Sequence, residues 1–312
     1  MDDVTLQVRE GEVLGILGES GSGKSTLARV LVGLVPPSAG AVTLDGRALG
    51  RSRRDRAVLR TNAQMVFQDP YSSLNPRMTV GAALREAIGV RRPDAPPGVP
   101  KRMEELLELV SLDPATAERL PSALSGGQRQ RVALARALAV APRFLIADEI
   151  TSALDVSVQG SVLNVLREVQ RELNFGLLFI SHDLPVVRYM SESIVVMFAG
   201  RIIESAPTDE LIGAPQHPYT RELLSAVPSA SGDTARPVVP LTTSTPTITR
   251  PIQVTATGCA FAARCPCGPA AVPERQICLR EDPRAQTGRR LHQAACHFAE
   301  SLDRGEHRTA QS

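Results

Sequence analysis

The chain has few aromatic residues, no tryptophan and no cysteine before position 259. Phe, Trp and Tyr together make up 3 % of the 312 residues, so the core must be built from Leu, Val, Ile and Ala. All five cysteines lie between Cys259 and Cys296. The first 258 residues therefore contain no disulfide, which fits a reducing compartment.

Long apolar runs and a strong net charge are also missing. No stretch of about 18 apolar residues exists, so the sequence predicts no membrane-spanning helix. The chain opens Met-Asp-Asp, without the basic start and apolar run of a signal peptide. The formal net charge is +2, so we expect no nucleic-acid partner. Any membrane role must depend on a partner.

Short apolar runs alternate with segments of helical periodicity. The runs at residues 13–17, 41–44, 63–67, 144–147, 176–180 and 193–198 predict strands, and residues 25–35, 125–138 and 156–173 predict helices. In the first helix, Leu34 belongs to the expected apolar face and Pro36-Pro37 is the expected stop. This alternation predicts an α/β fold with a mainly parallel sheet.

The composition divides the chain into three parts. Residues 1–227 are expected to form one cassette domain, with a helical subdomain at about 80–138, where strand signals are missing. Residues 228–258 are rich in Pro, Ser and Thr and predict a linker. Residues 259–312 form a cysteine-containing tail.

A phosphate-binding loop follows the first predicted strand. The segment Gly18-Glu19-Ser20-Gly21-Ser22-Gly23-Lys24-Ser25 matches the pattern G-x-x-x-x-G-K-[ST]. Its glycines let backbone N–H groups converge on phosphate oxygens, Lys24 should reach the β- and γ-phosphates, and Ser25 should ligate Mg²⁺. The residues expected to hold the nucleotide are Gly18, Ser20, Gly21, Gly23, Lys24, Ser25 and Thr26.

Five further segments follow in a fixed order. They are Phe67-Gln68-Asp69-Pro70, Leu124-Ser125-Gly126-Gly127-Gln128, Leu145-Ile146-Ala147-Asp148-Glu149, Ser152-Ala153-Leu154-Asp155 and Ile180-Ser181-His182-Asp183. Together with the phosphate loop, these segments resemble the ATP-binding cassette (ABC) family over residues 1 to about 225. The resemblance implies a P-loop NTPase fold and ATP hydrolysis with ATP and Mg²⁺.

The resemblance also implies roles for single residues. Asp148 corresponds to the carboxylate that holds Mg²⁺, together with Ser25 and Gln68, and Glu149 to the general base for the attacking water. His182 corresponds to the switch on the γ-phosphate, and Gln68 also links to the membrane partner. A carboxylate beside a metal-bound one can orient water, which agrees with these roles.

The signature segment is expected to act on a second cassette. Ser125, Gly126, Gly127 and Gln128 correspond to the signature that caps the ATP of the opposite subunit, and Asp155 would lie at the dimer seam. A Ser-Gly-Gly helix start is a good anion cap. Hydrolysis would therefore need two cassettes closing face to face, either with a sister ATPase subunit or as a homodimer.

Three segments resemble the dipeptide and oligopeptide importer branch, and more closely its second ATPase subunit. They are residues 68–77, His217-Pro218-Tyr219-Thr220-Arg221, and the tail with Gly258-Cys259, Arg264-Cys265-Pro266 and Cys296-His297. The branch implies a peripheral protein on the cytoplasmic face of the cell membrane. Its partners would be two membrane permease subunits and an extracytoplasmic solute-binding protein.

Other functions stay open at this point. Importers of nickel and other small solutes share the same features. A soluble ABC ATPase acting on ribosomes or DNA usually has two cassettes or long coiled-coil insertions, and this chain has neither. A non-hydrolysing partner is disfavoured by Glu149, His182 and the intact signature.

The tail cysteines are candidate ligands. Cys259, Cys265, Cys278 and Cys296 have the spacing C-x5-C-x12-C-x17-C, and four thiolates can hold a [4Fe–4S] cluster or Zn²⁺. Some members of the branch carry such a cluster. Cys267 is a further candidate, and unligated thiols are the alternative.

The start of the chain departs from the family pattern. A further strand and an aromatic residue that stacks on adenine usually precede the segment at which this chain begins. We therefore expect that the true start lies upstream or that this sequence is part of a longer chain.

Overall fold

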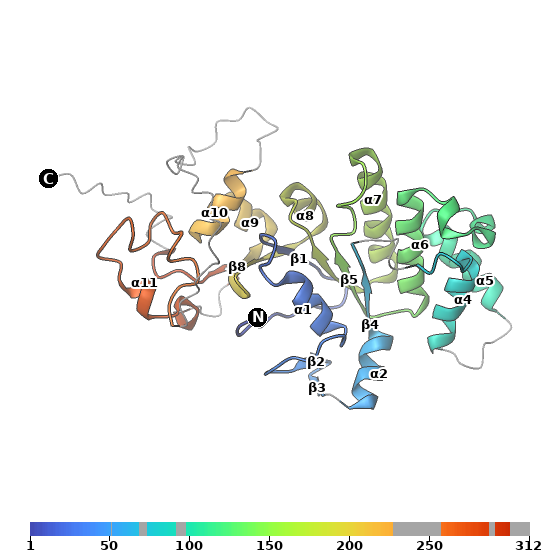
Figure 1. The fold of residues 1–312 in the computed structure, drawn as a ribbon, viewed down its shortest axis with the longest axis horizontal. Helices are drawn as coiled ribbons and strands as arrows, with labels where there is room; N and C mark the ends of the chain where they lie inside the picture. Colours follow the sequence, from blue (N-terminus) through green and yellow to red (C-terminus); the bar gives the residue numbers. More distant parts are fainter. Residues whose placement is uncertain (51, 69–73, 92–97, 227–256, 287–290, 300–312) are drawn as a thin grey trace. The chain divides into compact units, whose positions relative to one another are not determined.

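The structure is a computed structural model that describes residues 1–50, 52–68, 74–91, 98–226, 257–286 and 291–299 (Figure 1). The predicted linker at 228–258 lies outside the described residues up to position 256. The chain divides into two compact units. Unit 1 comprises Met1–Leu6, Gly15–Lys24 and Ser181–Ser312, and unit 2 comprises Gln7–Leu14 and Ser25–Ile180.

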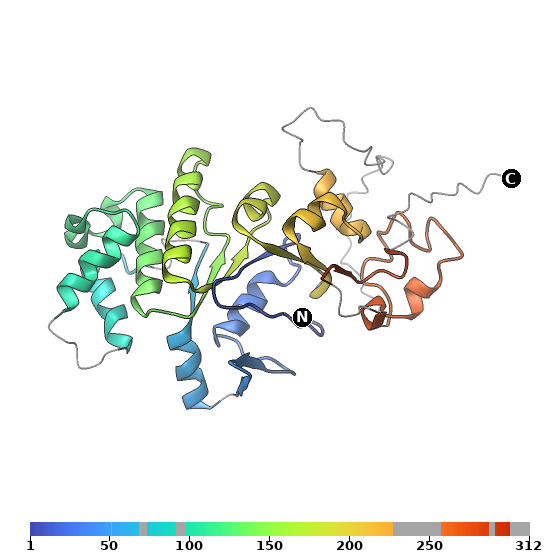
Figure 2. The same ribbon diagram turned by 180° about the vertical axis from the view of Figure 1, so that it is seen from behind.

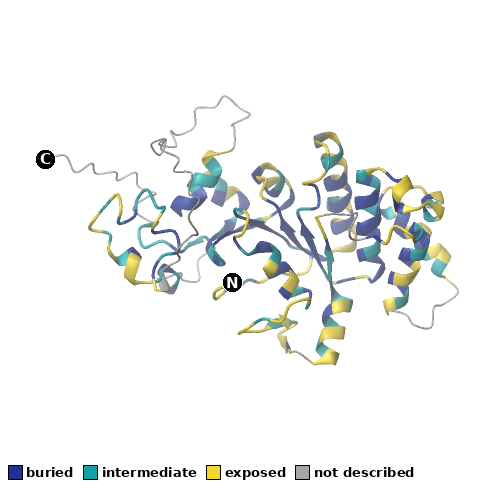
Figure 3. Ribbon diagram, viewed as in Figure 1, coloured by how far each residue is buried: buried dark blue, intermediate teal, exposed yellow. Residues whose placement is uncertain are grey.

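Unit 2 contains three parallel strands. They are β4 (Ala63–Val66), β5 (Phe144–Asp148) and β6 (Gly176–Ile180), in the order β4-β5-β6. Strand β6 is buried along its whole length and β5 from its second residue on, as continuous apolar runs require (Figure 3). The carboxyl ends of the three strands lie at one edge of the sheet, where ligands of α/β proteins usually bind.

Helices make up most of the rest of unit 2. Between residues 80 and 139 the described chain forms α4 (Val80–Arg91), α5 (Val99–Leu109), the short helices η1 (Pro114–Glu118) and η2 (Pro121–Ala123), and α6 (Gly126–Ala139). Helices α4, α5 and α6 pack on one another, as the views from both sides show (Figures 1 and 2). The long helix α7 (Val156–Leu173) packs against α6.

A hairpin and two short helices precede β4. Strands β2 (Val42–Leu44) and β3 (Arg47–Leu49) pair through an Asp45-Gly46 turn in which both residues have positive φ, typical of a tight type I′ hairpin. Helix α2 (Arg53–Asn62) begins at the side-chain cap of Ser52.

Helix α1 (Lys24–Leu31) ends four residues before the predicted end. Gly33 has φ 75°, and the backbone N–H of Leu34 donates to the carbonyl of Arg29, which is a glycine-terminated helix end. Leu34 is 61 % exposed, so its predicted place on the apolar face is wrong.

Unit 1 is antiparallel. Strand β7 (Ser193–Phe198) pairs with β8 (Arg201–Pro207), and β8 pairs with β9 (Gln293–Ala294), which comes from the tail. The helices of this unit are α8 (Leu184–Met190), α9 (Thr208–Gly213), α10 (Pro218–Ser225), α11 (Ile277–Arg280) and η3 (Pro283–Gln286). Phe198, Tyr219 and Phe261 pack together with ring centroids 4.7–5.5 Å apart.

The α/β class predicted from the sequence is confirmed. The strands expected at 13–17, 176–180 and 193–198 are β1 (Val13–Leu17), β6 and β7. In unit 2 the strands β4, β5 and β6 are parallel, as predicted, whereas β7, β8 and β9 of unit 1 are antiparallel.

Candidate functional site

The phosphate loop lies between the buried strand β1 and helix α1, as predicted. Gly18 has φ 156°, and a Cβ atom there would lie 2.3 Å from the carbonyl oxygen of Met197. Gly23 has φ 104°, a conformation that other residues rarely adopt. The path of this loop therefore depends on its glycines.

Lys24 lies inside the loop that it terminates. Its side chain is buried, and Nζ donates to the carbonyl oxygens of Gly18 at 2.7 Å and Glu19 at 2.9 Å. A buried ammonium group next to a glycine loop is a strong attractor for phosphate. Ser25 is half-buried and Thr26 is exposed in the first turn of α1, whereas Ser20 and Gly21 are exposed on the loop.

Two adjacent carboxylates follow β5 in unit 2. Asp148 ends the strand and is 7 % exposed, whereas Glu149 is half-buried. Glu149 has φ 49°, and its backbone N–H donates to the carbonyl of Ile180 at 2.9 Å. The chain therefore turns sharply at Glu149, and the two carboxylates differ in environment.

Gln68 leaves the sheet at the same edge. Val66 of β4 is paired with Ala147 of β5, so Gln68 and Glu149, each two residues beyond this pair, follow their strands at a similar level. The side chain of Gln68 is exposed. Asp69 to Ser73, part of the segment that resembles the peptide branch, lie outside the described residues.

The signature segment caps helix α6. Ser125 Oγ accepts from the backbone N–H of Gln128, and Gln128 Oε1 accepts from the backbone N–H of Ser125 at 3.0 Å, which is a capping box. Gly126 and Gly127 form the first turn, whose N–H groups have no partner within the helix.

The signature lies close to the start of α7. A Cβ atom on Gly127 would lie 2.5 Å from Val158 Cγ1, and one on Gly126 would lie 3.1 Å from Leu154 Cδ2. Asp155, the residue after Leu154, is the exposed N-cap of α7. The signature glycines therefore lie against Leu154 and Val158, the residues on either side of Asp155 in unit 2.

His182 belongs to unit 1, where it is exposed two residues after β6 and one residue before the N-cap of α8, Asp183. The predicted residues are thus distributed over both units. Unit 1 holds the loop up to Lys24 together with His182, and unit 2 holds Ser25, Thr26, Gln68, Asp148, Glu149, Ser125–Gln128 and Asp155.

Sequence reasoning missed Arg129, which comes directly after the signature. This arginine is 8 % exposed, and it donates from Nε to the carbonyl of Pro121 at 2.8 Å and from Nη2 to the carbonyl of Leu124 at 2.6 Å. It fastens the segment before the signature to α6. An arginine beside a glutamine in a helix looks solvated, so the sequence contains no signal for this role.

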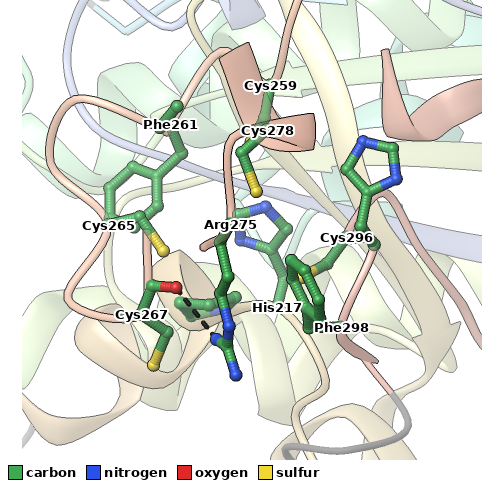
Figure 4. A pocket seen from close by; sticks show the side chains of 12 residues that line it. His217, Cys259, Phe261, Cys265, Cys267, Arg275, Cys278, Cys296 and Phe298 are labelled. Atoms are coloured by element: carbon green, nitrogen blue, oxygen red, sulfur yellow. Dashed lines mark hydrogen bonds between the residues drawn. The ribbon is translucent and has the colours of Figure 1, made fainter. Parts of the chain in front are cut away.

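The tail cysteines line a small cavity of about 20 Å³ in unit 1, together with His217, Arg275 and Phe298 (Figure 4). All five cysteines are unpaired. Burial raises the pKa of the Cys265 and Cys296 thiols to about 12, so both are protonated at neutral pH.

A metal or cluster does not fit the thiols as they are placed. Among the described residues, which include all five cysteines, no group of three or more His, Cys, Asp or Glu side chains is arranged to hold a metal ion. A cavity of about 20 Å³ has room for roughly one water molecule. The predicted set Cys259, Cys265, Cys278 and Cys296 therefore shares a pocket without forming a coordination site.

Within the described parts of the chain, no helix has the length and apolar character needed to cross a membrane.

Two family matches cover most of the chain. Residues 1–152 match the ABC transporter family, and residues 203–271 match the oligopeptide/dipeptide transporter C-terminal region. A putative peptide import ATP-binding protein from Brucella ovis is 43 % identical over 267 residues, which are 85 % of this chain and 83 % of that protein. A probable peptide ABC transporter ATP-binding protein from Sinorhizobium fredii is 45 % identical over 85 % of this chain and 74 % of its own length.

Similar solved structures belong to the same family as these sequence matches. The chain is similar to cbiO1 from Clostridium perfringens, part of an ABC transporter complex, with a TM-score of 0.62 and 30 % identity over 67 % of this chain and 82 % of that one. It is also similar to the dimeric, post-hydrolysis ATP-binding cassette MJ0796 bound to ADP and Pi, with a TM-score of 0.58 and 31 % identity over 65 % and 88 % of the two chains. The chain thus belongs to the ABC transporter ATP-binding proteins and has the oligopeptide/dipeptide transporter C-terminal region.

Proposed function

We propose that this chain hydrolyses ATP to power the import of di- or oligopeptides across the cytoplasmic membrane. The observation that carries the ATPase part is the glycine loop with Lys24 buried inside it, next to the start of α1. The peptide part rests on the C-terminal region and on relatives whose names describe peptide import.

The residues would divide the work as follows. Lys24 and the loop N–H groups would bind the phosphates, and Ser25, Gln68 and Asp148 would hold Mg²⁺, which would supply positive charge beside the phosphates. Glu149 orients the attacking water, because it is a less buried carboxylate beside the metal-binding one.

A second cassette would complete the site. The first-turn N–H groups of α6, at Gly126 and Gly127, are suited to cap the γ-phosphate held by a partner, with Asp155 at the seam beside them. His182 would contact the same phosphate from its own chain. The similarity to a dimeric cassette bound to ADP and Pi supports this arrangement.

The remaining partners follow from the transport role. We propose two membrane permease subunits, an extracytoplasmic solute-binding protein and a sister ATPase subunit, with this chain peripheral on the cytoplasmic face of the membrane. Gln68 is exposed at the carboxyl edge of the sheet in unit 2, which suits a residue that links metal and permease.

The test is ATP hydrolysis by the reconstituted complex, with and without a peptide library. We expect peptides to stimulate hydrolysis and Glu149→Gln to lower the rate by about a hundredfold or more, while ATP binding persists. Glu172→Gln, an exposed carboxylate in α7, is the matched control and should leave the rate unchanged.

Other outcomes would change the proposal. A response to nickel or another small solute in place of peptides would move the substrate and keep the ATPase. Normal turnover in Glu149→Gln would refute this residue as the base. Hydrolysis without any response to solutes, together with no association with permease subunits, would favour a soluble ABC ATPase.

The [4Fe–4S] cluster is kept as a separate hypothesis, and no step of the proposed function passes through it. The cysteine spacing alone supports it, while the placement of the thiols does not. Iron and acid-labile sulfide in the anaerobically purified complex would support it, and their absence would refute the cluster.

A further inference from the structure

Every polar group of Glu19, the second residue of the phosphate loop, is held by another part of unit 1. Its backbone N–H donates to Tyr219 Oη at 2.9 Å, and its carbonyl accepts from Lys24 Nζ at 2.9 Å. Its two carboxylate oxygens each accept from Arg264, from Nη1 and Nη2, both at 3.1 Å. Such a bidentate pair fixes orientation as well as charge.

The two residues that grip Glu19 come from distant parts of the chain. Tyr219 belongs to α10. Arg264 belongs to the tail, which follows residues 227–256. The sequence singled out both segments, His217 to Arg221 and Arg264 to Pro266, as features of the peptide branch without assigning them any task. Their shared target in the structure is one residue of the phosphate loop.

Tyr219 and Arg264, the two residues that hold Glu19, are themselves fixed by packing and hydrogen bonds. Tyr219 is fully buried, and it packs with Phe198 and Phe261. Arg264 lies over the rings of Phe198 and Phe261, with its guanidinium carbon 5.7 and 5.6 Å from their centroids. Arg264 Nη2 also donates to Glu222 in α10 at 2.8 Å, so the guanidinium group has little freedom to turn away.

The charge of Glu19 makes the grip important for binding. A carboxylate within the phosphate loop would repel a triphosphate, and a guanidinium paired with it offsets that repulsion. The partly exposed position of this pair weakens the effect through solvent screening but does not abolish it. The loop backbone must also keep its N–H groups directed at the phosphates, and both Tyr219 and Arg264 hold it at Glu19.

We propose that Tyr219 and Arg264 are positioning residues that hold the phosphate loop through Glu19, so that the C-terminal tail sets the affinity of the chain for ATP. This inference rests on the proposed nucleotide-binding role of the loop. It makes the tail a part of the ATP site through the contacts of Arg264 on the loop.

The test measures binding of a fluorescent ATP analogue to the full chain, and KM and kcat of the reconstituted complex. Arg264→Gln should raise Kd and KM about three- to tenfold and change kcat less than twofold. Arg264→Lys keeps the charge without the bidentate geometry and should give an intermediate Kd. Tyr219→Phe removes only the acceptor for the Glu19 N–H and should raise Kd about two- to fivefold.

Arg275→Gln is the matched control. Arg275 lies in the same tail, where it donates to the carbonyl of Cys267 at 2.9 Å and lies over Phe298. It has no described contact with the loop, so its replacement should leave Kd unchanged. An equal loss in Arg264→Gln and Arg275→Gln would overturn the proposal in favour of general damage to the tail.

A double-mutant cycle isolates the pair. The Glu19→Gln/Arg264→Gln double variant should bind ATP no more weakly than Arg264→Gln alone, because the unpaired carboxylate is then gone. Strictly additive losses of ATP affinity for Glu19→Gln and Arg264→Gln would refute the proposed role of the pair. A native Kd in both Arg264→Gln and Tyr219→Phe would also refute it. If Arg264→Gln fails to fold, Arg264→Lys and Tyr219→Phe decide by the same criterion.

The Lys24→Ala variant tests the nucleotide-binding role of the loop separately from the role of the tail. Unchanged ATP binding in Lys24→Ala would overturn the nucleotide site itself. Loss of binding in Lys24→Ala, combined with native Kd in the Arg264 and Tyr219 variants, would overturn only the role of the tail.

Discussion

Arg129 shows how much one side chain can fix in this fold. It is buried beside the signature segment, and it donates to two carbonyl oxygens, those of Pro121 and Leu124, that precede α6. Carbonyl groups that lose their donor in a buried place cost free energy, because water does not replace it.

We expect Arg129→Met to lower the free energy of unfolding by about 2–3 kcal/mol, since the shape is roughly kept and two acceptors lose their partner. Arg171→Met, an exposed change in the last turn of α7, should stay within about 0.5 kcal/mol of the wild type. Urea unfolding of the purified chains measures both. Equal midpoints for the two variants would contradict the role of Arg129.

Residue identities predicted motifs better than they predicted contacts. The glycines and Lys24 of the loop were found because their chemistry is local, a strand followed by a helix. Arg264 could not be placed on Glu19, because the two are 245 positions apart and no periodicity connects them. Leu34 was wrongly assigned to the apolar face of α1. The prediction ended this helix at Pro36-Pro37, whereas the helix already ends before Gly33, which has a positive φ.

At the scale of elements, α10 begins at a histidine that must be neutral. His217 is the N-cap, its Nδ1 accepts from the backbone N–H of Tyr219 at 3.1 Å, and its backbone N–H donates to the Glu204 carboxylate at 2.9 Å. Burial lowers the pKa of His217 to about 4, although the nearby Glu204 acts in the opposite direction. A proton on Nδ1 would remove the acceptor that caps the helix.

This depressed pKa predicts acid sensitivity. Between about pH 6.5 and 4 the unfolded chain binds a proton at His217 that the folded chain does not, so stability falls as the pH drops through this window. His217→Asn keeps a capping acceptor that does not titrate. From pH 7 to 4.5 the wild type should lose about 2 kcal/mol more than His217→Asn, by urea unfolding at each pH. Parallel losses would contradict a neutral buried His217.

Elements with continuous apolar runs were predicted well, and elements that depend on a partner were not. Strand β6 and helix α7 match their predicted bounds because burial and periodicity act within each segment. Strand β9 has only two residues, Gln293 and Ala294, and no strand pattern. Residues 293–294 form a strand because they pair with β8, and this pairing cannot be predicted from the local sequence.

At the scale of the whole molecule, the tail is built into unit 1. Phe261 of the tail is 1 % exposed and packs on Phe198 of β7 and Tyr219 of α10. The sequence predicted the tail as a separate part after a linker, and no periodic pattern indicates that it shares a core with α10. Aromatic residues are scarce in this chain, and this cluster contains most of the aromatic side chains of unit 1.

We expect Phe261→Ala to destabilise the chain by about 3–4 kcal/mol, because it removes a buried ring and leaves a cavity. Phe298→Ala in the same tail, where the ring is only half-buried under Arg275, should cost about 1 kcal/mol or less. Hydrogen exchange should show faster amides in β7 and α10 for Phe261→Ala only. Slow exchange there in that variant would show that the tail is not part of this core.

The pairing of β9 with β8 has a consequence for how the chain behaves in a crowded cell. The backbone N–H of Ala295 donates to the carbonyl of Ile203 at 2.7 Å, and Gln293 and Ala294 pair with Ser205 and Glu204. An uncovered strand of this kind is a template on which other chains can add strands and aggregate. The tail therefore covers this edge of β8, and a chain cleaved by a protease before Cys259 would lose both the Arg264 contact on the phosphate loop and the strand that shields β8 from other chains.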